Sequence, residues 1–260
     1  YVGTAHSLDS NFKSKVMNAL FAAGTLRIYK KNPVLAKTSA AKEELRQLGV
    51  PHAVIAPVGL DNAVLKKNIP ADEKMRLRKE HGFEADDVIL CNVSRLSWEK
   101  RPLELIDLFL QVKGKKKFKL IIVGNGPLEE ELNEKIRKNG LEKEVKIYPN
   151  VPYEKMWEIY EMSDYYLNMN KGEIFGMAIM EAVYYKTSVA AIRALGPSVT
   201  LKDMKGHKLC ENDDEMAEWI TGPYPSEKDL QESSEKMAAT FTWDRCADAF
   251  LQASSEKSSR

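Results

Sequence analysis

Two glutamates with seven residues between them flank a stretch that should change from loop to helix. Glu173 precedes Ile174, Phe175, Gly176 and Met177, and Glu181 falls about one turn or more into a helix expected over 176–185. N–H groups at a helix start attract anions, and carboxylates accept hydrogen bonds from hydroxyls. Helical side chains lean toward the N-terminus, so Glu181 should face the crevice beside Glu173. We therefore expect this segment to bind a phosphorylated sugar. The alternative is a pair of ordinary surface glutamates, and we prefer the functional interpretation.

Two strand-to-helix connections add further candidates. Arg95 and Lys100 lie between an expected strand and an expected helix, where a diphosphate would meet fixed cations and a favourable helix dipole. Taken alone, this segment would be interpreted as a solvated basic loop. Gly124 opens a Gly-x-Gly turn after the next strand, a pattern that also serves simple packing.

His6 is the third kind of candidate. It follows the apolar start of the chain, which reads as a strand, and precedes Ser7-Leu8-Asp9-Ser10. A position after a strand in this N-terminal part would let it face the other candidates across a cleft. A single histidine is commonly structural, and the local sequence leaves both roles open.

The middle of the chain alternates short apolar strands with amphipathic helices. Strands are expected over 88–93, 119–123, 145–148, 165–169 and 188–192, with helices over 102–112, 127–138, 153–162 and 176–185. This pattern predicts an α/β fold with a doubly wound parallel sheet covered on both faces, a Rossmann-like domain. Ligands of such sheets bind at the carboxyl ends of the strands. Loops 94–101, 124–127, 150–152 and 170–176 should therefore share one rim.

The flanking regions predict a division into three parts. Before the sheet we expect a helix over 11–30, strands over 33–36 and 53–56, and a helix over 39–48 with Ser39 as its N-cap and Gly49 as its end. A turn-rich break at 57–61 predicts a domain boundary near residue 60. Helices are expected over 227–239 and 243–253. The parts are thus 1–60, 61–225 and 226–260.

Composition limits the class of protein. The apolar fraction of 43% suffices for a buried core, and a net charge of +1 gives no general attraction to nucleic acid. The cysteines Cys91, Cys210 and Cys246 match no metal spacing and are expected to be core or near-core thiols. No apolar stretch long enough to span a bilayer and no signal peptide is evident, so we expect a cytoplasmic protein. The basic run 114–119 is expected to be a solvated turn opposite the site; peripheral contact with an anionic membrane, at its inner face, is the alternative.

Together these residues resemble the retaining family-four glycosyltransferases of the GT-B fold over nearly the whole chain. The segment from Glu173 to Glu181 is similar to that family's two glutamates separated by seven residues. Val93-Ser94-Arg95 with Glu99-Lys100 resembles its diphosphate-binding loop. The run 122–128 resembles its strand-turn-helix, and Phe241-Thr242-Trp243 the start of its C-terminal helix.

The start of the chain adds to this resemblance. Thr4-Ala5-His6-Ser7-Leu8 is similar to the catalytic-histidine strand of sucrose-phosphate-synthase-like and mycothiol-pathway members. The resemblance implies that residues 1–60 are the last portion of an N-terminal Rossmann-like, acceptor-side domain, most of which would precede Tyr1. The chain departs from the family at Ile174, where a small residue is commoner, at Lys186, which replaces a glycine, and at Leu195-Gly196-Pro197, which replaces a Gly-Gly-like turn.

The resemblance implies a hexosyltransferase-type activity, in which a sugar moves from a nucleoside-diphosphate sugar to an acceptor hydroxyl with retention and without a metal or other cofactor. Glu173 would contact the donor sugar, Glu181 the ribose, and His6 the sugar or transition state; we take His6 and Glu173 as catalytic candidates. Arg95, Lys100 and N–H groups near Gly176 would stabilise the departing diphosphate. Base contacts in such folds often use backbone atoms, here around Asn150 and Val151.

The sequence allows more than one donor, acceptor and function. A UDP-sugar donor is favoured, with GDP- and ADP-sugars as alternatives. The acceptor is a carbohydrate, a lipid-linked molecule or a small molecule. A GT-B epimerase would not be expected to carry the two-glutamate segment. A non-catalytic nucleotide-sugar-binding or partner-binding module is the rival from another class, because this chain alone would hold little of the acceptor side.

Overall fold

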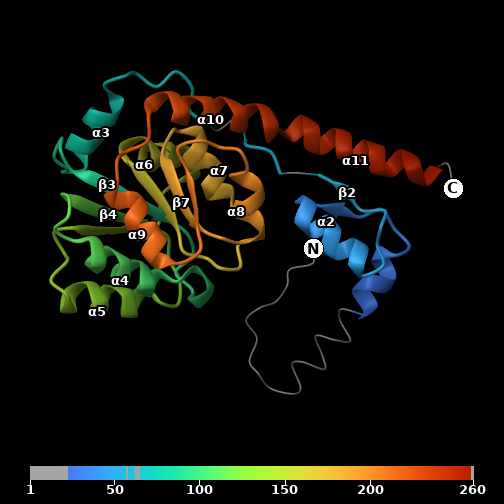
Figure 1. Ribbon diagram of the computed structural model, residues 1–260, viewed down its shortest axis with the longest axis horizontal. Coiled ribbons are helices and arrows are strands. Elements are labelled where there is room, and N and C mark those ends of the chain that lie inside the picture. Colours follow the sequence, from blue (N-terminus) through green and yellow to red (C-terminus); the bar gives the residue numbers. More distant parts are fainter. Residues whose placement is uncertain (1–22, 57, 62–64, 259–260) are drawn as a thin grey trace, which may run out of the picture. The chain divides into compact units, whose positions relative to one another are not determined.

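Six parallel strands form the central sheet in the computed structural model, which describes residues 23–56, 58–61 and 65–258 (Figure 1). Their order is β5-β4-β3-β6-β7-β8, and each neighbouring pair is parallel. The strands are β3 (Val88–Val93), β4 (Phe118–Val123), β5 (Val145–Tyr148), β6 (Tyr165–Asn168), β7 (Ser188–Ile192) and β8 (Lys208–Cys210). The predicted parallel sheet is confirmed, and β8 is an addition to it.

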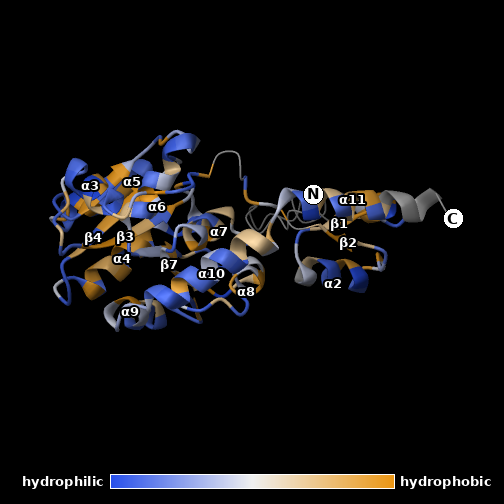
Figure 2. Ribbon diagram, turned by 90° about the horizontal axis from the view of Figure 1, so that it is seen from above, coloured by the Kyte–Doolittle hydropathy of each residue, from blue (hydrophilic) through white to orange (hydrophobic). Residues whose placement is uncertain are grey.

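Helices cover both faces of this sheet, because its strands are apolar on both sides. On one face α4 (Pro102–Val112), α5 (Glu129–Lys138) and α9 (Asp213–Thr221) pack in a core that includes Leu90, Ile122 and Leu167 of the strands. Figure 1 shows α6 (Met156–Met162) and α7 (Met177–Tyr184) on the other face. Figure 2 shows the hydrophobic colours concentrated in strands such as β3 and β4, while α3 (Glu73–Glu80) and α10 (Glu227–Thr240) are largely hydrophilic.

Several elements of the sheet domain were not predicted. These are α3, α8 (Leu195–Thr200), β8 and α9. The sequence of α3, EKMRLRKE, is almost wholly charged, and α8 contains Gly196 and Pro197, so neither shows an apolar helical period. A signal for α9 was present, since Asn212 caps it by accepting a hydrogen bond from the N–H of Glu215 at 2.9 Å.

The chain divides into two compact units, Leu60–Thr240 and a smaller unit formed by Tyr1–Gly59 with Phe241–Arg260. The prediction grouped both C-terminal helices in one segment, 226–260. The structure divides that segment, because α10 packs on α7 in the larger unit whereas α11 (Trp243–Ser258) contacts β2 (Val54–Ile55) in the smaller one.

The smaller unit contains a two-stranded parallel sheet of β1 (Leu35–Ala36) and β2, with α2 (Ser39–Gln47) between them in sequence. The predicted N-cap is displaced by one residue. Thr38, and not Ser39, has extended backbone angles and accepts a hydrogen bond from the N–H of Ala41 at 3.1 Å. Of the helix predicted over 11–30, the structure describes 23–30, and 23–29 are helical.

Candidate functional site

The sheet has a topological switch point between β3 and β6. From β3 the chain continues to β4 and β5 on one side, and from β6 it continues to β7 and β8 on the other. The connections that follow β3 and β6 therefore leave the sheet in opposite directions, and a crevice opens between them at the carboxyl ends of the strands. The predicted loops 94–101 and 170–176 are the two that border this position.

Lys100 and Glu173 meet across the switch point. The Lys100 ammonium donates to Oε2 of Glu173 at 2.8 Å, and Nδ2 of Asn170 donates to the same oxygen at 3.1 Å. The two charged side chains are 25% and 16% exposed, so the pair lies at the surface of the crevice and remains partly accessible. Burial acts to raise the pKa of Glu173, but the hydrogen bond and charge of Lys100 outweigh it, and the pKa is lowered. Glu173 is an anion held in place by a cation.

Arg101 fixes the loop that carries Lys100. Its guanidinium forms two hydrogen bonds with the Asp213 carboxylate, at 3.1 and 2.8 Å, and a third to the carbonyl of Met169 at 3.3 Å. Arg101 has φ 55° and ψ 48°, a left-handed conformation that is uncommon for a residue with a side chain. These contacts tie the loop after β3 to the end of β6 and to the start of α9.

The loop that carries Glu173 is held from two directions. The amide oxygen of Asn170 accepts from the N–H of Gly172 at 2.9 Å, and the N–H of Gly196 donates to the carbonyl of Glu173 at 2.8 Å. Gly196 approaches so closely that a Cβ there would lie 2.5 Å from the backbone nitrogen of Phe175. The Leu195-Gly196-Pro197 turn, a departure from the family pattern, thus has a packing role.

Gly176 ends this loop and begins α7. It has φ 83°, in the left-handed region that glycine adopts without strain. Phe175 is buried, and Ile174 and Met177 are half-buried. Within the described part of the chain, no residue accepts a hydrogen bond from the N–H groups of Gly176, Met177 or Ala178. These donors are therefore available to an anion at the helix N-terminus.

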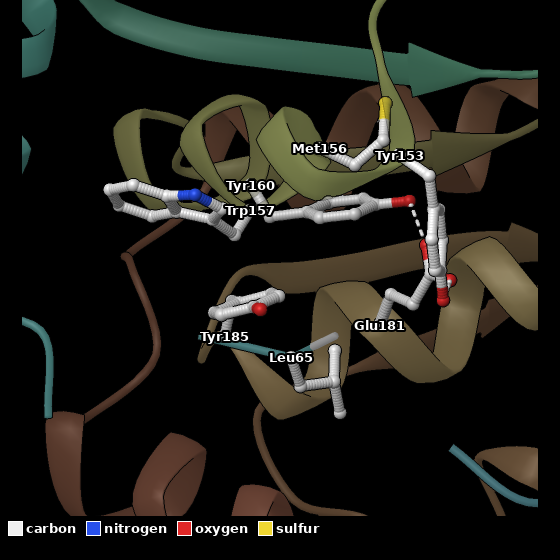
Figure 3. Close-up of a pocket in the computed structure, with 7 residues that line it drawn as sticks. All are labelled: Leu65, Tyr153, Met156, Trp157, Tyr160, Glu181 and Tyr185. Atoms are coloured by element: carbon white, nitrogen blue, oxygen red, sulfur yellow. Dashed lines mark hydrogen bonds between the residues drawn. The ribbon is translucent and has the colours of Figure 1, made fainter. Parts of the chain in front are cut away.

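Glu181 lies on α7 between two tyrosines. Oε1 accepts from the hydroxyl of Tyr153 at 3.1 Å and Oε2 from that of Tyr160 at 2.7 Å, as Figure 3 shows. Glu181 is only 7% exposed. Burial raises the pKa of Glu181, although both phenol hydrogen bonds act to lower it. The two tyrosines and Glu181 line a small pocket with Leu65, Met156, Trp157 and Tyr185.

The loops after β4 and β5 meet beside this site. A Cβ on Gly124 would lie 2.0 Å from the carbonyl oxygen of Ser94, so this glycine allows the loops after β3 and β4 to touch. Asn125 then donates to the side chain of Asn150 at 3.0 Å. Asn150 is exposed and Val151 half-buried, at the position predicted for base contacts.

Arg95 is exposed, and its guanidinium forms no hydrogen bond or ion pair with the residues that the structure describes. Its guanidinium is therefore available to a ligand. His6 and the expected strand around it lie outside the described residues. Between residues 23 and 258, as far as they are described, no cluster of three or more His, Cys, Asp or Glu residues could hold a metal ion.

Four residues of the site were not predicted from the sequence, namely Asn170, Tyr153, Tyr160 and Arg101. Asn170 and Arg101 lie inside or beside loops that were predicted, and their roles depend on which loops the fold brings together. Tyr160 follows the apolar period of α6 and was counted only as a helix residue. Its hydroxyl is the one polar group that a fully buried tyrosine has to satisfy, which is a usable signal for a buried partner.

The three cysteines are core or near-core thiols, as predicted, because Cys91 and Cys210 are buried and Cys246 is half-buried. The basic run 114–119 was predicted to be a solvated turn, but its last two residues already belong to β4, at the end of the sheet opposite the site. Its Lys116 is also not simply solvated, because its ammonium donates to the carbonyls of Ile220 and Gly222. In the portion of the chain that the structure covers, no helix combines the length and apolar character needed to cross a membrane.

The parallel sheet and its switch point between β3 and β6 define an α/β domain of the GT-B type, in agreement with the fold of similar solved structures. A family model described as glycosyl transferases group 1 matches residues 73–237. The chain therefore belongs to the group 1 glycosyl transferases.

Individual relatives are similar at low identity. The D-inositol 3-phosphate glycosyltransferase of Mycobacterium avium is 26% identical over 285 residues, covering 96% of this chain and 62% of the relative. Among solved structures, Anabaena Alr3699/HepE in complex with UDP and glucose superposes with a TM-score of 0.72 at 20% identity, over 90% of this chain and 67% of that one. The sucrose-phosphate synthase of Thermosynechococcus elongatus has a TM-score of 0.75 at 18% identity, over 90% and 61%. The chain thus spans about three-fifths of the length of the curated relatives it matches first.

Proposed function

We propose that this chain binds a nucleoside-diphosphate sugar at the carboxyl rim of its sheet and, as part of a glycosyltransferase, takes part in transfer of the sugar to an acceptor hydroxyl. The observation that carries the proposal is the arrangement of the segment from Glu173 to Glu181. It joins a carboxylate paired with Lys100, the free N–H groups at the start of α7, and a second carboxylate held by two phenols. This short stretch thus combines N–H groups that can donate hydrogen bonds to an anion with carboxylates that can accept hydrogen bonds from hydroxyls.

Each part of this stretch has a role in the proposal. The N–H groups at Gly176 and Met177, with Arg95 and Lys100, would bind the diphosphate and stabilise the charge that develops on it as the glycosidic bond breaks. Glu173 would accept hydrogen bonds from the donor sugar. Glu181 would accept them from the ribose, and the rim near Asn150 and Val151 would meet the base.

Retention at the anomeric carbon and independence from metal belong to the proposal as well. In this proposal the cations and backbone donors would supply the positive potential that a metal provides in other enzymes, so groups of the chain itself would stabilise the departing diphosphate. UDP is the favoured nucleotide, because a similar fold is solved with UDP bound, and GDP and ADP are the alternatives. The acceptor, whether carbohydrate, lipid-linked or small, and a role for His6 in catalysis remain predictions, as does a cytoplasmic location.

Donor turnover tests the activity. The chain is incubated with UDP-glucose, GDP-mannose and ADP-glucose in the presence of EDTA, and sugar release or transfer to added glycosides is followed by proton NMR. The proposal expects slow release or transfer from one donor, with the first-formed product having the donor's anomeric configuration. A first-formed product of opposite configuration would overturn retention, and activity that needs added metal would overturn metal independence.

The second candidate function is that of a non-catalytic module, which binds a nucleotide sugar or a partner and does not transfer the sugar. Nucleotide-sugar binding with no release or transfer under the conditions above would favour this binding module. Turnover would exclude it.

A further inference from the structure

The carboxylate of Glu181 is oriented by two phenols that come from different elements. Tyr160 belongs to α6, and Tyr153 begins the short turn η2 (Tyr153–Lys155) that follows the loop after β5. Each phenol donates to a different carboxylate oxygen, at 2.7 Å from Tyr160 and 3.1 Å from Tyr153. No other residue among those described donates to this carboxylate. Both Glu181 oxygens are thereby fixed in direction.

The hydrogen-bonding capacity of the carboxylate shows what this orientation leaves free. A carboxylate offers about four lone-pair sites, roughly two on each oxygen. The two phenols occupy one site on each oxygen, so one acceptor site remains on each. One free acceptor site on each oxygen matches in number the two adjacent hydroxyls of a ribose, whereas a freely rotating carboxylate would present these sites in many directions.

The two tyrosines differ in how firmly they are held. Tyr160 is 1% exposed, and its ring stacks on that of Tyr185 with centroids 5.9 Å apart and planes at 10° (Figure 3). The hydroxyl of Tyr185 is itself fixed by the N–H of Lys66 at 2.9 Å. Tyr153 is 44% exposed at the rim. Burial and the nearby Glu181 raise the pKa of Tyr153 to about 12, and burial raises that of Tyr160 as well, so both phenols remain donors at neutral pH.

We propose that Tyr160 and Tyr153 are positioning residues that give the site its selectivity for ribonucleotides over 2′-deoxyribonucleotides, by holding Glu181 so that one free acceptor site on each oxygen meets the ribose diol. This inference rests on the proposed function, since it assumes that a nucleoside diphosphate binds beside Glu181. Tyr160 is the main constraint because its ring is buried and stacked on that of Tyr185. Tyr153 follows the loop of Asn150 and Val151 and so connects that loop to the ribose site.

The test compares a nucleotide with its 2′-deoxy form. UDP, GDP and ADP are titrated calorimetrically into the chain, and the one that binds best is paired with its 2′-deoxy counterpart. The ratio of the two dissociation constants measures the contribution of the 2′-hydroxyl. We expect the wild-type chain to bind the ribonucleotide about tenfold more tightly, the effect of one hydrogen bond to a charged group.

Tyr160→Phe removes only the phenol oxygen and should bring this ratio close to one, mainly by weakening the ribonucleotide. Tyr166→Phe is the matched control, because Tyr166 is equally buried and its hydroxyl donates to the carbonyl of Val93 at 3.4 Å and not to Glu181. It should leave the ratio unchanged. If Tyr160→Phe does not fold, Tyr153→Phe provides the test at an exposed position, and a smaller fall in the ratio is expected.

The outcomes separate this inference from the function on which it rests. Failure of the wild-type chain to bind any of the three nucleotides would overturn both. Binding without any preference for the ribonucleotide would overturn the ribose contact of Glu181 and the positioning role, while nucleotide binding would stand. A preference that Tyr160→Phe and Tyr153→Phe both retain would overturn the positioning role alone.

Discussion

The ammonium of Lys100 lies 2.8 Å from the carboxylate of Glu173, although the two residues are 73 positions apart in sequence. The two residues come from the loops that follow β3 and β6, the strands between which the sheet changes direction. The pair therefore places one cation and one anion next to each other at the switch point, where both remain partly exposed. A diphosphate sugar carries the complementary groups, namely a negative diphosphate for Lys100 and sugar hydroxyls for Glu173.

Removal of the Lys100 ammonium should leave the negative charge of the partly buried Glu173 carboxylate without its positive partner. We expect Lys100→Met to destabilise the chain by about 1–2 kcal/mol at neutral pH, because a partly buried carboxylate loses its charged partner. The lowered pKa of Glu173 means that this stabilisation is present above the ordinary glutamate pKa and is lost as the pH falls through the folded-state pKa. Urea unfolding at neutral and acidic pH measures it. The exposed Lys171→Met is the control, and equal stability of the two variants would contradict the expectation.

Arg101 combines a strained backbone with a bidentate ion pair to Asp213. Both Arg101→Ala and Arg101→Gly remove the ion pair, but only glycine adopts φ 55° without strain. We therefore expect the alanine variant to be less stable than the glycine variant by about 1 kcal/mol. Thermal or urea unfolding of the two proteins provides the comparison. Equal stability would show that the left-handed conformation at Arg101 costs nothing.

Gly196 controls the position of the Glu173 loop. A methyl group there would lie 2.5 Å from the Phe175 nitrogen and 2.6 Å from the Ile174 carbonyl carbon, so backbone must move. Gly196→Ala should weaken nucleotide binding and lower stability by roughly 1–3 kcal/mol, the usual cost of overpacking. Gly172→Ala is the matched control in the same loop, since its nearest new contact is a side-chain oxygen at 3.6 Å. Calorimetric binding and unfolding of both variants are compared, and equal effects would contradict the proposed packing role.

The buried carboxylate of Glu181 is expected to lower the stability of the folded state while it contributes to nucleotide binding. Its pKa is raised by burial, so the folded state binds more protons than the unfolded state in the window above the ordinary glutamate pKa, and stability falls as the pH rises through that window. Glu181→Gln keeps an acceptor for Tyr160 and carries no charge. We expect it to unfold at the same or a higher temperature than wild type at neutral pH while it loses nucleotide affinity.

Calorimetric melting across the acidic to neutral range checks this expectation. The advantage of the glutamine variant should disappear below the ordinary glutamate pKa, where Glu181 itself is protonated in both states. The exposed Glu142→Gln should show neither effect. A Glu181→Gln protein that melts well below wild type at neutral pH would show that the carboxylate is a net stabilising group.

The sheet could be predicted from the sequence because its strands are short, apolar and separated by amphipathic helices. The bounds predicted for β3, β5, β7 and α4 agree with the structure. Elements whose sequence has no apolar period, such as α3 and α8, were not predicted. Helix α3 is almost entirely charged, and its buried Arg78 forms its contacts with residues such as Asp164, far away in sequence.

The site was predictable to the extent that it depends on sequence order along single segments. Glu173, Gly176 and Glu181 share one stretch, and the parallel pattern put the loop of Lys100 on the same rim. The partners of these residues were not predictable, because Asn170, Arg101 and Tyr160 look like ordinary loop or helix residues until the fold brings the segments together. The carboxylate of Glu181 is the clearest case, since its two phenols come from two other elements.

The central claim is that the carboxyl rim of this sheet binds a nucleoside diphosphate. Calorimetric titration of the chain with UDP, GDP and ADP in the presence of EDTA tests it most directly, together with Arg95→Ala, Glu181→Ala and the surface control Glu142→Ala. The account predicts micromolar binding of one nucleotide that Arg95→Ala and Glu181→Ala weaken and Glu142→Ala does not. No binding of any nucleotide, or binding that Arg95→Ala and Glu181→Ala leave unchanged, would contradict it.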